Sequence, residues 1–413
     1  MDVLIERCCG LDVHQATVVA CMLRPGRGTR VEKTVRTFRT VTSELEELRE
    51  WLLESGVTHV AMESTGVYWM PVYEVLATGE MQLVVGNAAH IRNVPGRKSD
   101  VKDAEWIAHL VRHGLIRASI VPTPLMRRLR EYTRLRRKLT EERTSTRNRI
   151  LRLLETANIK LASFASDVFG TSGTLMLDAL IEGTQSPREM ASLAKGVLRK
   201  KRVDLELALR GRVQEHHRFL LGLHRARIAE IDKTIAMLDE RIDSELVVVA
   251  DVVERLRQIP GVDRVIAATI VAELGTDMTY FPTAAHAAAW AGLCPGSNRS
   301  AGKRTQAETA RHGNVALKTA LTQAAVCAQR VKGTHFQEKY RRIQRRRGAG
   351  RAAVATAHAI LVAAYNMIKS GQAYNERGPH QHSDAERQAI ARRLRHRIEQ
   401  LGFEVDVRSK SAA

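Results

Sequence analysis

Four acidic side chains in the first quarter of the chain stand where structural elements end or begin. Asp12 follows a short apolar run, Glu63 closes another, and Asp100 and Asp103 open a segment with helical periodicity. Asp100 and Asp103 are three residues apart, and this spacing places them on one face of a helix. Acids at the ends of adjacent strands meet at one edge of a sheet, and Mg²⁺ prefers such oxygen ligands. The pattern predicts a metal site that can hold the attacking and leaving oxygens of a phosphodiester.

Each of these acids has a plainer interpretation when it is taken alone. An Asp that follows a strand is commonly a turn or capping residue, and Asp100 and Asp103 also suit the positive end of a helix dipole. Glu63 is different, because an acid that closes an apolar strand gains nothing from capping. We therefore favour the metal site for the four acids together.

The composition favours a polyanionic partner. The 413 residues include 65 Lys and Arg against 45 Asp and Glu, a formal net charge of +20, and nucleic acid is the commonest partner of so basic a protein. A membrane surface is the alternative, but we expect no apolar run of about 18 residues and no signal peptide. The scattered cysteines indicate reduced thiols of the cytoplasm: Cys8, Cys9, Cys21, Cys294 and Cys327.

The elements that must position the acids belong to a mixed α/β domain over residues 1–120. Apolar runs and alternating residues predict strands at 3–11, 17–23, 33–39, 58–62 and 81–85. Apolar residues at helical spacing predict helices at 43–55, from about residue 68, and at 101–114. Strands and helices alternate after the first hairpin, so we expect helices packed against a sheet.

Residues 121–246 are predicted to form a helical coiled-coil hairpin that supports oligomerisation. Residues 126–153 are rich in Arg and contain no Gly or Pro, which predicts a long exposed helix. A second helical stretch runs from 203 to 246, and a small helical insert separates the two.

The C-terminal part is predicted to be an all-α domain over residues 247–370, followed by a polar tail, 371–413. The domain opens with two apolar helices joined by Ile259, Pro260, Gly261 and Val262. This is the turn chemistry of a helix-hairpin-helix, in which backbone N–H groups hold a DNA phosphate.

Two arginine clusters are candidate nucleic-acid contacts. Charges spread around a helix contact backbone phosphates better than base edges. The alternative is a solvated helix face with ion pairs, but too few acids are present to pair them. The clusters consist of Arg127, Arg128, Arg130, Arg134, Arg136, Arg137 and Lys138, and of Arg341, Arg342, Arg345, Arg346 and Arg347.

A second place for chemistry is the Pro-, Gly- and Ser-rich segment 295–302. It is followed at once by Lys303 and Arg304, so a phosphate could dock beside a serine hydroxyl there. Serines in such segments are most often turn residues. A nucleophile also needs an activating base, and His312 is near only in sequence.

Three motifs, GLDVH, AMESTGVYW and KSDVKDAEWIA, resemble those of the DEDD-type insertion-sequence transposases (the "IS one-ten" group, with the related Piv invertases). The resemblance continues through FPTAAHAAAWAGLCPGSNRSAGKRTQAETARHGNVALKTAL and covers roughly residues 3–370. It implies a ribonuclease H-like fold of the RuvC type for the N-terminal domain. It also implies that Asp12, Glu63, Asp100 and Asp103 are the Mg²⁺-binding tetrad.

The resemblance further implies how the reaction proceeds. Ser300, or else Ser297, is the expected nucleophile, activated by the metal-bound carboxylates in a composite site across domains or subunits. Expected partners are donor and target DNA, a noncoding guide RNA and further copies of the chain, from dimer to tetramer, in the bacterial nucleoid. The run KRTQAETARHGN is less basic than is usual in the family.

Two alternatives remain open at this point. The first is a metal-dependent, structure-selective nuclease, similar to a Holliday-junction resolvase, in which Ser300 is merely structural. The second is a non-catalytic scaffold that binds RNA or DNA. A covalent protein–DNA adduct separates the recombinase from the nuclease, and dependence on Asp12 and Glu63 excludes the scaffold.

Overall fold

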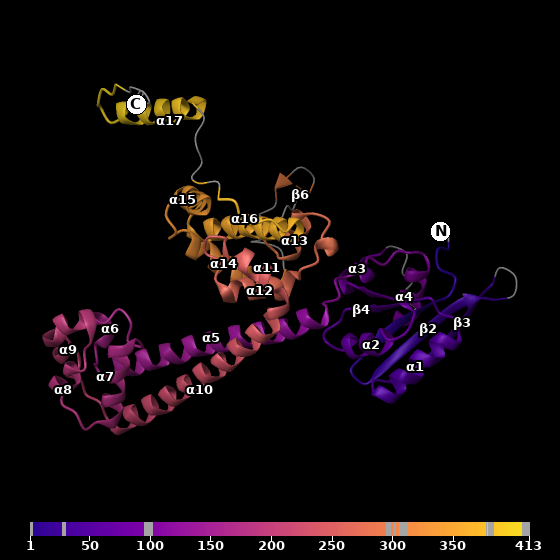
Figure 1. Cartoon of the computed structure of the whole chain (residues 1–413), viewed down its shortest axis with the longest axis horizontal. Coiled ribbons are helices and arrows are strands. Elements are labelled where there is room, and N and C mark those ends of the chain that lie inside the picture. Colours follow the sequence, from indigo (N-terminus) through magenta and orange to yellow (C-terminus); the bar gives the residue numbers. More distant parts are fainter. Residues whose placement is uncertain are drawn as a thin grey trace. The chain divides into compact units, whose positions relative to one another are not determined.

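The structure, a computed structural model, describes residues 3–26, 30–94, 102–294, 299–300, 303–304, 313–376, 378 and 384–406. The chain divides into two units, Met1–Val121 and Pro122–Ala413. In Figure 1 the first unit is indigo to purple, and the second runs from purple to yellow. The predicted division into four parts stays a prediction.

The first unit is organised around a five-stranded sheet in the order β3-β2-β1-β4-β5. The strands are β1 (Cys8–Val13), β2 (Thr17–Pro25), β3 (Val31–Arg39), β4 (His59–Glu63) and β5 (Gln82–Gly86). β1 pairs antiparallel with β2 and parallel with β4, β2 is antiparallel to β3, and β4 is parallel to β5. The carboxyl ends of β1, β4 and β5 therefore lie at the same edge of the sheet.

Helices cover both faces of this sheet. They are α1 (Thr42–Glu54), α2 (Trp69–Leu76), α3 (Ala88–Asn93) and α4 (Asp103–Arg112). Successive residues of a strand point to opposite faces: Cys9 and Leu11 of β1 pack with α1 and α2, whereas Cys8 packs with α4. β1 is thus buried on both faces, which explains its almost continuous apolar sequence.

Gly10 sets the distance between β1 and α4. An added Cβ at Gly10 would lie 2.3 Å from the carbonyl oxygen of Ala104 and from the amide nitrogen of Ala108. Any side chain would overlap the helix backbone, so only glycine permits this approach. Because α4 begins at Asp103, the contact also fixes where this acid stands relative to Asp12 in β1.

The second unit opens with a long helical hairpin. α5 (Pro124–Thr156) and α10 (Glu215–Leu246) lie side by side (Figure 1). Ion pairs join Arg128 to Glu245 at 2.9 Å and Arg143 to Asp232 at 2.7 Å, so the two helices run antiparallel. Between them in sequence are α6 (Leu161–Phe164), α7 (Thr171–Glu182), α8 (Pro187–Ser192), the 3₁₀ helix η1 (Gly196–Lys201) and α9 (Arg202–Ala208).

An alanine-rich helical bundle follows the hairpin. Its elements are η2 (Val247–Val249), α11 (Ala250–Arg257), α12 (Arg264–Leu274), η3 (Met278–Tyr280), α13 (Ala284–Trp290), α14 (Val315–Ala328), α15 (His335–Arg347) and α16 (Ala349–Ser370). A two-stranded pair, β6 (Arg299–Ser300) and β7 (Lys303–Arg304), precedes α14, and α17 (Asp384–Glu399) follows the bundle in sequence. Alanines let these helices approach closely: Ala324, Ala325 and Ala328 of α14 are fully buried.

α16 is the helix that bears on the expectation that no apolar run is long enough to span a membrane. Among the described residues it is the one helix long and apolar enough to cross a bilayer, judged by length and composition. However, 56% of its most apolar window is buried inside the protein. α16 packs against α11, α13, α14 and α15, and Ile360 and Leu361 are fully buried. These contacts are those of a core helix, and periodicity along the sequence does not distinguish the two cases.

Candidate active site

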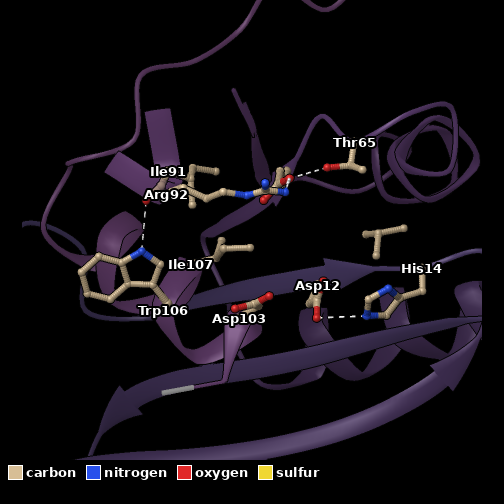
Figure 2. A pocket seen from close by; sticks show the side chains of 10 residues that line it. Asp12, His14, Thr65, Ile91, Arg92, Asp103, Trp106 and Ile107 are labelled. Atoms are coloured by element: carbon tan, nitrogen blue, oxygen red, sulfur yellow. Dashed lines mark hydrogen bonds and ion pairs between the residues drawn. The ribbon is translucent and has the colours of Figure 1, made fainter. Parts of the chain in front are cut away.

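Three of the four predicted acids line one cavity at the carboxyl edge of the sheet. Asp12 is near the end of β1, Glu63 is the last residue of β4, and Asp103 is the first residue of α4. β1 and β4 are parallel neighbours with Leu11 opposite Met62, so Asp12 and Glu63 end adjacent strands. The cavity has a volume of about 150 Å³. Figure 2 shows Asp12 and Asp103 at this cavity.

Polar partners that the sequence analysis missed hold two of these acids. His14 Nε2 lies 3.1 Å from Asp12 Oδ2, and the Thr65 hydroxyl donates to Glu63 Oε1. His14 and Thr65 each stand two residues after an acid, and this spacing places side chains on the same side of an extended chain. The i, i+2 pattern in GLDVH and in MEST was therefore a usable signal.

Arg92 brings a positive charge to the same cavity. Its guanidinium nitrogen lies 3.6 Å from Glu63 Oε1, and both side chains line the cavity. α3, which contains Arg92, is fixed to α4 because Trp106 Nε1 donates to the carbonyl of Ile91 at 3.2 Å (Figure 2). Nothing in the sequence around Arg92 distinguishes it from other surface arginines.

The acids of the cavity offer carboxylate oxygens, the kind of ligand atom that suits a divalent cation. Carboxylate oxygens are hard ligands, and the side chains of Asp12 and Glu63 are 26% and 21% exposed, so an ion could reach them. Within the described ranges, no group of three or more His, Cys, Asp or Glu side chains is placed so that it could hold a metal ion. Asp100, the fourth predicted ligand, lies outside the described residues.

The predicted serine lies in the second unit. Ser300 is in β6 and pairs with Lys303 of β7 in an antiparallel bridge. The side chains of Ser300, Lys303 and Arg304 are outside the described part of the structure, as are Ser297 and His312. The contact of any of these side chains with a phosphate therefore stays a prediction.

Arg130 and Arg134, which we predicted to bind nucleic acid, surround a buried carboxylate. The Glu273 side chain is fully buried. Arg134 donates two hydrogen bonds to it, at 2.8 and 2.9 Å, and Asn314 Nδ2 donates a third, at 2.6 Å. Arg130 Nε lies 3.2 Å from the same carboxylate, and only 14% of the Arg130 side chain is exposed. The Arg130 guanidinium is thus held inside the bundle, and its contact with nucleic acid stays a prediction.

Other arginines of α5 also have acidic partners, contrary to our expectation that acids were too few. Arg128 makes a bidentate contact with Glu245, and Arg136 makes one with Asp239. Arg137 pairs with Glu141 one turn along α5. The acids for Arg128 and Arg136 come from α10, far away in sequence. Nucleic-acid contact by Arg127, Arg128, Arg134 and Arg137 stays a prediction.

The second arginine cluster is different. It lies on α15, where Arg341, Arg342, Arg345, Arg346 and Arg347 are all exposed. In the described part of the chain, none of these arginines makes an ion pair or a side-chain hydrogen bond. They form an exposed cationic surface, and its contact with a nucleic-acid backbone stays a prediction.

Where a helix-hairpin-helix was predicted, the structure has α11, a turn and α12. Gly261 has a φ of +88°, and an added Cβ would lie 2.3 Å from the Ala324 carbonyl oxygen, so the turn packs on α14. Asp263 caps α12 by accepting from the Ile266 amide at 2.8 Å. A carboxylate at this helix N-terminus disfavours an anion, and the predicted phosphate contact stays a prediction.

A larger cavity, of about 490 Å³, lies between α15 and α16. Lys339 and His358 line it, together with Phe336 and Tyr374, and its lining contains no Asp or Glu. Burial lowers the pKa of both Lys339 and His358, and each is further lowered by a neighbouring cation, Arg342 and Lys339 respectively. Without carboxylates this cavity offers nothing for the predicted metal chemistry, so the acidic cavity is the candidate active site.

The mixed sheet with acids at the ends of adjacent parallel strands is compatible with a ribonuclease H-like domain that processes nucleic acid. A family model described as a transposase of the DEDD type of IS110 matches residues 9–159, and one described as the transposase IS116/IS110/IS902 family matches residues 253–341. A comparison with curated proteins gives no match. The two family matches together cover more than half of the chain, which belongs to the IS110 family of transposases.

Membership of this family settles the class of reaction and the substrate. The protein is an enzyme that cuts and rejoins DNA. The DEDD type implies the use of a divalent metal.

Proposed function

We propose that this transposase exchanges DNA strands through a covalent serine intermediate, with Ser300 as the nucleophile and Mg²⁺ at Asp12, Glu63, Asp100 and Asp103. The observation that supports the proposal most is that three of these acids, from three separate elements, line one cavity at the carboxyl edge of the sheet. A noncoding guide RNA and a dimeric or tetrameric assembly are part of the proposal, since the family resemblance implies both.

The acidic cavity has the residues to orient a phosphate. Asp12, Glu63 and Asp103, completed by Asp100, would hold the metal. When bound, Mg²⁺ stabilises negative charge on the phosphate oxygens and on the leaving oxygen. His14 and Thr65 hold the carboxylates of Asp12 and Glu63 in place. Arg92 offers a guanidinium, which binds phosphate oxygens well.

The serine step conserves the phosphodiester bond. The Ser300 oxygen attacks a DNA phosphorus atom, the new serine O–P bond forms, and the bond from phosphorus to one deoxyribose oxygen breaks. The serine hydroxyl proton leaves, and the departing deoxyribose oxygen takes up a proton. In the reverse step a hydroxyl of another strand attacks the phosphoserine and releases the serine. No water is consumed, so strand exchange needs no external energy source.

The proposal is tested by trapping the reaction on end-labelled DNA in the presence of Mg²⁺. We expect a covalent protein–DNA adduct that is lost in Ser300→Ala and kept in Ser297→Ala. Asp12→Asn should lower the rate of adduct formation by about 10²-fold or more, because transition-state charge loses its stabilisation, while DNA binding remains.

Three other results would reject the proposal or part of it. Free DNA ends and continued cutting by Ser300→Ala would indicate the metal-dependent nuclease. An adduct kept in Ser300→Ala but lost in Ser297→Ala would move the nucleophile to Ser297. Unchanged activity of Asp12→Asn would exclude a role for the acidic cavity.

The guide RNA is tested in a separate experiment. The same reaction is run with and without RNA copied from the sequence that flanks the gene.

A further inference from the structure

The residues that flank the segment with Ser300 in sequence meet at one narrow neck of the bundle. We define the neck as Trp290, Gly292, Gly313 and Asn314, which stand on both sides of residues 293–312. The backbone N–H of Asn314 donates to the backbone carbonyl of Trp290 at 3.2 Å. An added Cβ at Gly313 would lie 2.4 Å from the Gly292 nitrogen. The two sides of the neck are therefore in direct backbone contact.

The ion pair between Arg130 and Glu273 contacts both sides of the neck. On the downstream side, Asn314 Nδ2 donates to Glu273 Oε2 at 2.6 Å. On the upstream side, the Arg130 guanidinium carbon lies 6.0 Å from the centre of the Trp290 ring, within the range of a cation–π contact. Arg130 Nε is 3.2 Å from Glu273 Oε2. Arg130 and Glu273 thus connect Trp290 to Asn314.

The pair is itself firmly held. Arg130 donates to the carbonyl oxygens of Ala272 and Glu273, at 2.8 and 2.7 Å, so its guanidinium is anchored to the end of α12. Arg134 contributes two more hydrogen bonds to the Glu273 carboxylate. Both arginines belong to α5, so the neck is fixed to the long hairpin as well as to the bundle.

Stability by itself does not explain why a carboxylate is buried here. Desolvation of the charges offsets most of their attraction, and apolar residues of similar volume often serve stability as well or better. A fully satisfied polar network does hold its members in one arrangement. Here every member of the network touches the neck or a residue that does.

We propose that Glu273 is a positioning residue for the serine nucleophile. Together with Arg130 it holds together the two sides of the neck, which flank Ser300 in sequence on both sides. The inference rests on the proposed role of Ser300. A misplacement of about 1 Å can cost roughly 10²-fold in rate, so a small loosening of the neck should be measurable.

Asn314→Ser separates this role from helix capping. Asn314 Oδ1 accepts from the Leu317 amide and caps α14. A serine oxygen can replace that cap, but serine lacks the amide that donates to Glu273. The matched control is Ser186→Ala, which removes the cap of α8, far from the neck in sequence. Both variants should fold, with similar melting temperatures.

The measured quantity is the rate of serine adduct formation at saturating DNA, per folded and DNA-bound molecule. We expect Asn314→Ser to form the adduct about 10- to 100-fold more slowly, with unchanged DNA affinity, and Ser186→Ala to match the parent protein. Glu273→Gln should show the same selective loss if it folds. An Asn314→Ser rate equal to that of the parent overturns the inference. If the parent forms no Ser300 adduct, the proposed function fails first, and this inference fails with it.

Discussion

At the scale of single residues, the environment of each titratable group decides whether it can take part in chemistry. The acids of the cavity are part-exposed and have polar neighbours, as in the contact of Asp12 with His14. The three cysteines of the sheet are the opposite case. Cys8, Cys9 and Cys21 are fully buried in the same unit. Nucleophilic sulfur is thus present in the first unit but sealed from solvent.

Burial should make these thiols unreactive. It raises the pKa of Cys8 and of Cys21 to about 11 and that of Cys9 well above its ordinary value. Because only the thiolate reacts, we expect an alkylating reagent at pH 8 to modify the exposed Cys327 and to spare the three buried thiols until the protein unfolds. Mass spectrometry of the labelled peptides measures this. Rapid labelling of Cys8 or Cys21 in the folded protein would contradict it.

The same pKa shifts give a pH dependence of stability with a definite sign. An unfolded cysteine releases its proton near its ordinary pKa of 9.0, whereas folded Cys8 and Cys21 retain theirs up to about 11. Between these values the folded chain binds more protons than the unfolded chain, so the free energy of unfolding falls as pH rises. Chemical denaturation at pH 8 and pH 10 should therefore show a lower midpoint at pH 10.

At the scale of elements, the acidic cavity depends on how closely α4 approaches β1. Asp12 belongs to the strand, and Asp103 opens the helix. The helix backbone contacts Gly10 directly, so a single missing side chain sets the separation of the two acids. The alternation of β1, which sends Cys9 and Leu11 to the opposite face, leaves Gly10 facing α4.

Gly10→Ala should displace α4 from the sheet. The new Cβ would overlap the backbone atoms of Ala104 and Ala108 at 2.3 Å, and overpacking of this kind typically costs about 1–3 kcal/mol. We expect a lower melting temperature and a loss of DNA cleavage larger than the loss of folded protein. Gly79→Ala is the control, since its Cβ would meet its nearest neighbour at 3.5 Å, an ordinary contact. Full activity of Gly10→Ala would show that the position of α4 is not critical.

At the scale of the whole molecule, net charge overstates the cationic surface that is available to DNA. The chain carries a formal charge of +20, but arginines of α5 such as Arg128 and Arg136 are joined to acids of α10. The arginines of α15 remain exposed. Location, more than total charge, should therefore govern binding to the phosphate backbone.

Two triple variants with the same change in charge test this. Arg341, Arg345 and Arg346 are changed to Gln in one, and Arg24, Arg36 and Arg39, which form exposed surface pairs, are changed in the other. Removal of one arginine that binds a phosphate should reduce the slope of log affinity against log salt by about 0.9. We expect a reduction of about 2.7 for the α15 variant and little change for the other. Equal slopes would mean that net charge alone matters.

The sequence by itself determined most of the elements and the order of the acids along the chain. Strands and amphipathic helices follow from local patterns of apolar residues, and Asp12 and Glu63 are visible because each closes such a pattern. The strand predicted at 3–11 shows the limit: Leu4 is 71% exposed, and β1 begins only at Cys8, because pairing with β2 and β4 decides where a strand starts.

Only the tertiary structure decided which polar groups are available for chemistry. Arg130 looks like its neighbours in the sequence. In the structure, however, it forms an ion pair with Glu273, which is more than a hundred residues away in the chain. Likewise, Asp263 caps the N-terminus of α12, where the sequence predicted that backbone N–H groups bind a phosphate. The physical reason is that an ion pair depends on the distance between two charges, and helix packing sets this distance between residues that are remote in the chain.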